Sequence, residues 1–261
     1  MEHSKAARAL RWAAVGCAAA LTALRVLIIK TSFDDAGLLP RGSHALTVTV
    51  VASVCAFLFL WLLSMRLSRL PGTEACFPDS PVWLAVRLVA AILVFFGSLF
   101  VLLDGQTVIE KPDRLAAFGG MLSALLMIIT AMLVRRGNGT FWLRLAPAVF
   151  AAASLILRFR MWSHDPLVIH IAPVLLAWTC CMVEMMLLSG FSLGVGRRRS
   201  GALFGLCAGM FACTVVPDYA LGMRTGLHDL LTLLGLAIWC AAAGFALLRD
   251  HGQTEASKTE D

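Results

Sequence analysis

The chain has few charged residues, and it has no polar stretch long enough to fold as a soluble domain. Asp, Glu, Lys and Arg together make up 15% of its 261 residues. No segment between its apolar runs exceeds roughly twenty residues, which is too short to build a hydrophobic core of its own. Any function must therefore be built from the apolar runs and their short connections.

The chain also lacks the short motifs that hold common cofactors. It has no Gly-rich phosphate-binding loop followed by Lys, so an ATP-driven pump is not expected from this chain alone. It has no His-x-x-x-His, His-Glu-x-x-His or Cys-x-x-Cys spacing that would hold two metal ligands close together. Only His170 lies well inside an apolar run, which excludes a bis-histidine haem site. We expect no cofactor.

What the chain has in abundance is apolar sequence. Hydrophobic residues make up 59% of it, and its mean hydropathy is +0.83. Because unsatisfied backbone groups are too costly in lipid, windows long enough to cross about 30 Å of hydrocarbon must be helices. The expected fold class is an all-α, polytopic integral membrane helix bundle of about eight transmembrane helices. The windows are residues 10–29, 44–65, 82–103, 115–134, 141–162, 167–193, 202–221 and 227–248.

Basic residues favour a cytoplasmic location for both termini. With eight spans, about eleven Lys and Arg residues flank the helices on the side of the termini and about seven on the other, outer side. This predicts one transmembrane domain, residues 1–248, in the cell membrane. The short polar tail, residues 249–261, is expected to be disordered. The window 141–162 carries four interruptions, so a shallow or re-entrant segment is the alternative there. They are Arg144, Pro147, Arg158 and Arg160.

The most distinctive polar pattern within the spans lies on one predicted hairpin. The windows 141–162 and 167–193 are joined by a very short turn, so they must be antiparallel neighbours. Counting from the turn places Arg144 and Glu184 at the same depth. Glu184 is expected either to form a buried ion pair with Arg144, or with Arg87 at similar depth, or to belong to an ion, proton or substrate path.

A second polar set is expected on the outer side. Short turns bring Asp218 and Asp229 to similar depth, and Arg25 is expected to snorkel or to meet an outer acid such as Asp34. Imidazole and carboxylate groups are good zinc ligands, so a metal site is the alternative to plain interfacial residues. The set is Arg158, His164, Asp165, His170, Asp218, His228 and Asp229, of which His164, His170, His228 and Asp229 are weak candidate metal ligands.

Small and basic residues predict the contacts of the window 202–221. Three glycines at the head of this helix, the first of them directly before the window, are spaced four residues apart, which makes a groove where another helix can approach closely, within the chain or in a homodimer or larger membrane complex. A basic triplet precedes the window and is expected to contact anionic lipid headgroups rather than nucleic acid, despite the net charge of +6. The residues are Gly201, Gly205 and Gly209, and Arg197, Arg198 and Arg199.

These observations leave three functions open. A small transporter, channel or membrane subunit of a larger complex, using the polar groups of the 141–193 hairpin, is favoured because nearly the whole chain is membrane-embedded. A membrane sensor or scaffold protein without catalytic activity is the second. A metal-dependent intramembrane hydrolase with an outer-side His/Asp site is the third. The balance is against an enzyme.

Overall fold

The computed structural model describes residues 2–33, 44–67, 80–103, 111–134, 141–162, 172–221 and 226–248. Its elements are α1 (Glu2–Ser32), α2 (Ala45–Ser64), α3 (Pro81–Leu103), α4 (Lys111–Val134), α5 (Phe141–Trp162), α6 (Ala172–Phe191), α7 (Arg198–Ala220) and α8 (Leu227–Leu247). All eight are long and apolar enough to cross a membrane. The expected all-α, multi-pass membrane bundle is confirmed.

The helix bounds follow the apolar windows to within about four residues, except at the starts of α1 and α6. α1 begins at Glu2, well before residue 10, because the residues that precede the window include strong helix formers such as Ala, Lys and Arg. α5 is one continuous helix through Pro147 and is long enough for a full span, rather than a re-entrant segment. α6 begins at Ala172, and the first residues of its window lie outside the described residues.

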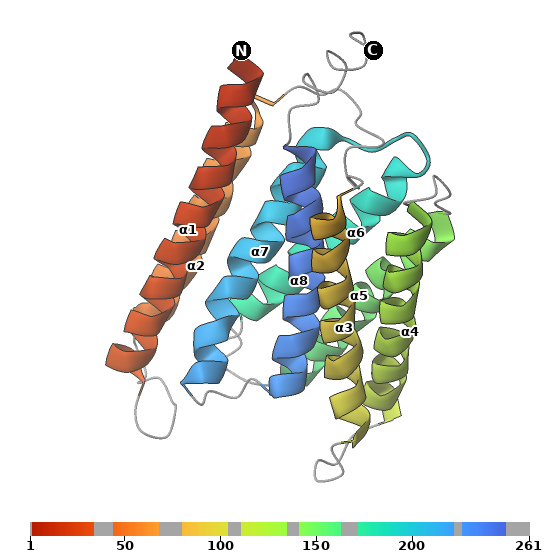
Figure 1. Cartoon of the computed structure of the whole chain (residues 1–261). Coiled ribbons are helices and arrows are strands. Elements are labelled where there is room, and N and C mark those ends of the chain that lie inside the picture. Colours follow the sequence, from red (N-terminus) through yellow and green to blue (C-terminus); the bar gives the residue numbers. More distant parts are fainter. Residues whose placement is uncertain are drawn as a thin grey trace.

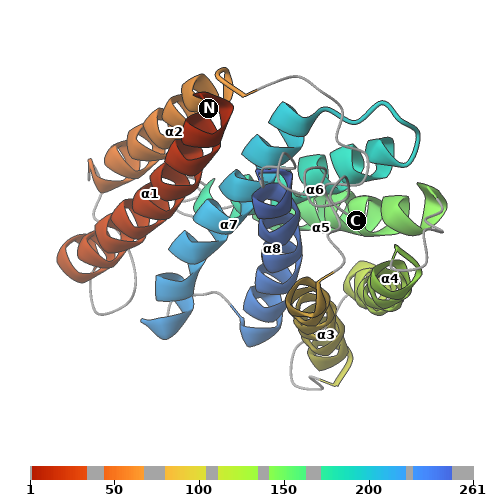
Figure 2. The same cartoon turned by 45° about the horizontal axis from the view of Figure 1, so that its top comes forward.

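The helices form a ring with a hairpin attached to one side (Figures 1 and 2). Each of α3 to α7 contacts the next helix along the chain, and α8 returns to contact α3. α1 and α2 pair with each other and contact the ring mainly through α7. Odd-numbered helices run from the end where α1 begins, called here the N-terminal side, to the opposite end, the distal side. Even-numbered helices run back.

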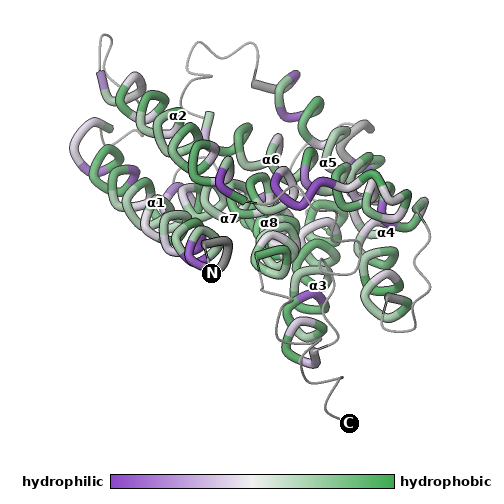
Figure 3. Tube along the Cα trace, turned by 90° about the horizontal axis from the view of Figure 1, so that it is seen from above, coloured by the Kyte–Doolittle hydropathy of each residue, from purple (hydrophilic) through white to green (hydrophobic). Residues whose placement is uncertain are grey.

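α7 and α8 are the most buried helices of the bundle. In their membrane-spanning windows 72% of residues are buried, whereas in α2 only 22% are. Large apolar side chains such as Val51, Phe96 and Leu122 are instead exposed, on the surface that faces lipid in a membrane. Most helical turns are accordingly hydrophobic in Figure 3, with few hydrophilic ones between them.

Glycines set how closely the central helices approach. A Cβ atom at Gly205 would lie 2.5 Å from the carbonyl oxygen of Cys240 and 3.0 Å from the Cα of Gly244, both on α8. On the other side of α8, a Cβ at Gly235 would lie 2.6 Å from the carbonyl oxygen of Ala90 on α3. Backbone therefore meets backbone at both contacts, an arrangement that small residues permit in membrane helices.

Candidate functional site

A buried ion pair joins the α1–α2 hairpin to the ring on the distal side. Arg25 of α1 is 1% exposed, and Asp218 of α7 is 3% exposed. The Arg25 Nε lies 2.7 Å from Asp218 Oδ1, and its Nη2 lies 3.1 Å from Oδ2, so the contact is bidentate. The sequence had suggested Asp34 as the partner of Arg25. Asp34 lies outside the described residues; among the described ones, Asp218 is a partner of Arg25.

A second charged group links three helices of the ring on the same side. Arg158 of α5 forms an ion pair with Asp229 of α8 and lies over the indole ring of Trp178 on α6, 4.2 Å from its centroid. The Nε2 of His228 lies 3.6 Å from Asp229 Oδ1. This arrangement satisfies the Asp229 carboxylate and places a cation on the face of an aromatic ring, a favourable contact.

The expected outer-side set is therefore divided. Arg158, His228 and Asp229 come together, whereas Asp218 belongs to the separate pair with Arg25. The remaining members, His164, Asp165 and His170, lie outside the described residues. Within the described part of the chain, no three His, Cys, Asp or Glu side chains gather as metal ligands would.

Glu184 lies on the N-terminal side, fully buried in α6. Neither of its carboxylate oxygens has a hydrogen-bond partner, and no ion pair joins it to Arg144 or Arg87, all three being described residues. The expected pair is wrong because equal depth does not fix the direction in which a side chain points. Arg144 lines a small cavity with Met185, whereas Glu184 lies beside Gly201 of α7.

The surroundings of Glu184 are apolar or weakly polar, and the side chains of Leu247 and Phe191 pack at Gly201 next to the carboxyl. A Cβ built at Gly201 would lie 3.7 Å from Glu184 Oε1. Four free thiols lie close enough to the carboxyl group to interact with it electrostatically. One of them, the Cys240 thiol, donates a hydrogen bond to the backbone carbonyl oxygen of Cys181 at 3.8 Å. Thiols are weak donors, so they stabilise a buried carboxylate charge poorly. The thiols are those of Cys180, Cys181, Cys207 and Cys240.

The two arginines expected as partners of Glu184 converge on a tryptophan instead. The guanidinium carbon of Arg87 lies 5.9 Å from the ring centroid of Trp239 on α8. Arg144 and Trp239 both line an interior cavity of about 10 Å³, which is close to the space that one water molecule occupies. Sequence patterns did not point to Trp178 or Trp239, since a tryptophan in an apolar run does not indicate which cation it contacts.

The basic triplet before α7 makes contacts within the chain. Arg198 donates from Nε to the carbonyl oxygen of Leu247 at 2.6 Å, and Arg199 donates from Nε to the hydroxyl of Ser64 at 3.3 Å. Arg197 is exposed. Contact of this triplet with anionic lipid headgroups stays a prediction.

The end of α6 carries a spacing that the sequence-based expectations did not include. Gly190, Ser192 and Gly194 match Gly-x-Ser-x-Gly, which in hydrolases forms a nucleophile elbow between a strand and a helix. Here it terminates a helix. Gly194 has φ +72°, and the amide of Val195 donates to the carbonyl oxygen of Gly190, as in a Schellman motif. The local geometry thus explains Gly194 without a catalytic role for Ser192.

The lack of an ion pair at Glu184 predicts additive stability changes. In a double-mutant cycle, the effects of Glu184→Gln and Arg144→Ala on the free energy of unfolding in detergent should add within about 0.5 kcal/mol. The cycle of Arg158→Ala with Asp229→Asn is the positive control, and its interaction energy should exceed that value because those side chains touch. Coupling of Glu184 to Arg144 as strong as in the control would contradict the structure.

No protein-family model, no curated protein and no solved structure matches this sequence.

Proposed function

We propose that this protein is a membrane transport protein, a transporter or channel, in which Glu184 binds the proton or cation that moves. The observation behind this proposal is a carboxyl group with no exposed surface and no hydrogen-bond partner, located in a membrane-spanning helix. A buried carboxylate without a partner costs several kcal/mol when it is charged. Membrane proteins retain such groups mainly where ions or protons pass.

Because a charged carboxylate is unfavourable in this buried position, Glu184 has two distinct states, one neutralised and one charged. A proton or a bound cation neutralises the carboxyl in the dry arrangement described above, whereas release of that charge requires water to reach the side chain. Binding and release are thus linked to opening and closing of the space around Glu184, which is the requirement for coupled transport.

The neighbours of Glu184 support such an opening. Gly201 presents no side chain to the carboxyl, and the space over it is filled by the ends of the Leu247 and Phe191 side chains, so displacement of these side chains would open space beside Glu184. The water-sized cavity lined by Arg144 and Trp239 is also lined by Met185, the residue after Glu184. A water-sized space that Arg144 and Thr130 help to line therefore lies on the adjacent side of α6.

Proton movement in liposomes tests the proposal. The purified chain is reconstituted into liposomes that contain a pH-sensitive dye, and a potassium diffusion potential set with valinomycin drives protons inward. The wild-type protein should acidify the lumen faster than protein-free liposomes. Glu184→Gln should lower the rate to the protein-free level, because an amide does not bind and release a proton at these pH values.

The matched control is Glu255→Gln, the same change in the sequence after α8, which should keep the wild-type rate. Thermal unfolding of Glu184→Gln should be unchanged or shifted upward, because the substitution removes no ion pair. A Glu184→Gln protein that is incorporated equally and moves protons, Na⁺ and K⁺ as fast as the wild type would contradict the proposal.

A further inference from the structure

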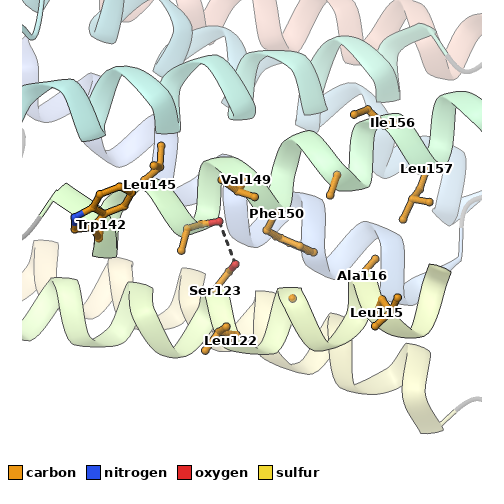
Figure 4. Close-up of a pocket in the computed structure, with 13 residues that line it drawn as sticks. Leu115, Ala116, Leu122, Ser123, Trp142, Leu145, Val149, Phe150, Ile156 and Leu157 are labelled. Atoms are coloured by element: carbon orange, nitrogen blue, oxygen red, sulfur yellow. Dashed lines mark hydrogen bonds between the residues drawn. The ribbon is translucent and has the colours of Figure 1, made fainter. Parts of the chain in front are cut away.

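An apolar groove lies between α4 and α5 (Figure 4). Its volume is about 730 Å³, within the range of about 300–1,000 Å³ that is usual for ligand-binding pockets. α5 contributes to it along most of its length, and α4 contributes from Leu115 to Ser123. The lining residues are Leu115, Ala116, Gly119, Leu122, Ser123, Trp142, Leu145, Ala146, Val149, Phe150, Ala153, Ile156 and Leu157.

The walls of the groove are almost entirely apolar and can accommodate a hydrocarbon chain. Among the lining side chains only Ser123 and Trp142 carry a polar atom, and the Ser123 hydroxyl already donates to the carbonyl oxygen of Ala146 at 3.5 Å (Figure 4). Leu115 and Ile156 are 72% and 66% exposed, so the groove opens to the surroundings of the bundle. In a membrane those surroundings are acyl chains, which need no hydrogen bond from the wall.

The groove has the length and direction of an extended acyl chain. On α5 it runs from Trp142 to Leu157, a rise of about 22 Å at 1.5 Å per residue. This is roughly two thirds of the thickness of a bilayer's hydrocarbon core. Since α5 spans the membrane, a chain lying in the groove is parallel to the chains of the surrounding lipid.

One end of the groove carries a positive charge. Arg160 follows Ile156 by four residues and Leu157 by three, so it lies on the same face of α5 as the lining residues. It is exposed and belongs to the last turn of the helix, where lipid headgroups begin. Arg158, two residues earlier, points to the opposite face and contacts Asp229. Arg160 is therefore the cation of this helix end that faces the groove.

We propose that the groove binds one glycerophospholipid with an anionic headgroup, with an acyl chain along α4 and α5 and the phosphate at Arg160 on the distal side. This proposal is independent of any role of Glu184. The hydrophobic effect does not distinguish the groove from bulk lipid, so the selectivity comes from the headgroup. A guanidinium near the membrane surface favours an anionic lipid by about fivefold in affinity.

Native mass spectrometry of the purified full chain tests whether the positive charge of Arg160 selects anionic lipids. The protein in detergent is titrated separately with phosphatidylglycerol and with phosphatidylcholine of identical acyl chains. Phosphatidylglycerol should bind about fivefold more tightly to the wild type. Arg160→Gln should abolish this preference. Arg8→Gln, which removes an exposed arginine from α1 on the N-terminal side, should retain it.

A second variant tests the groove. Ala153→Phe fills the middle of the groove and should weaken binding of both lipids while leaving the helical content unchanged. Equal binding of the two lipids to the wild type, or an equal loss of preference in Arg8→Gln and Arg160→Gln, would overturn the proposal. So would unchanged lipid binding by Ala153→Phe, or a dimer that this substitution dissociates, since the occupant would then be a second copy of the chain.

Discussion

Replacing Arg25 with Met is expected to lower the free energy of unfolding by about 3–5 kcal/mol, the usual cost of removing one partner of a buried ion pair. The substitution leaves the Asp218 carboxylate buried, at 3% exposure, without the bidentate contact that now satisfies both of its oxygens. The loss is measured by denaturant titration in mild detergent, with intrinsic tryptophan fluorescence as the readout.

Two comparisons identify the cause of that loss. Lys30→Met removes the same charge from the same helix at an exposed position and should change stability by no more than about 0.5 kcal/mol. The double variant Arg25→Met with Asp218→Leu should recover most of the loss, because apolar side chains replace a buried charged pair at little cost. If Arg25→Met and Lys30→Met proved equally mild, the pair would contribute nothing to the attachment of α1.

Gly205→Ala is expected to destabilise the bundle by about 1–3 kcal/mol, the usual cost of overpacking. The added Cβ would lie 2.5 Å from the carbonyl oxygen of Cys240, a backbone atom that moves only when α8 moves. α7 and α8 would therefore have to separate at the centre of the bundle. The measurement is the same denaturant titration, and Gly205→Leu should have a larger effect.

Gly16→Ala is the matched control for this prediction. A Cβ at Gly16 of α1 meets no atom within 4 Å, so alanine should stabilise the helix by up to about 1 kcal/mol through its higher helix propensity. The two glycine-to-alanine changes are thus expected to differ in sign. A Gly205→Ala variant as stable as the wild type would show that the α7–α8 contact is looser than described.

The number and type of the membrane-spanning elements could be predicted from sequence because they depend on local composition. Each helix must satisfy its own backbone hydrogen bonds in lipid, so an apolar window of sufficient length is enough to predict it. Local periodicity also explains why Arg144 and Arg158, fourteen residues apart, both face α8: Arg144 shares a cavity with Trp239, and Arg158 pairs with Asp229.

The choice of partners was decided by tertiary structure. Arg25 and Asp218 are 193 residues apart in sequence, and no local pattern relates them. Glu184 and Arg144 share a depth, as counting from their turn predicts, but depth leaves open how each helix is rotated about its axis. Helix packing decides that rotation: Glu184 of α6 lies beside Gly201 of α7, whereas Arg144 of α5 lines the cavity that it shares with Trp239 of α8. The chain's composition determined that it forms a bundle of membrane helices, and helix packing determined which of its charged side chains meet. The reason is that hydrophobicity fixes the position of a helix along the membrane normal, whereas side-chain contacts depend on how each helix is rotated in the plane of the membrane.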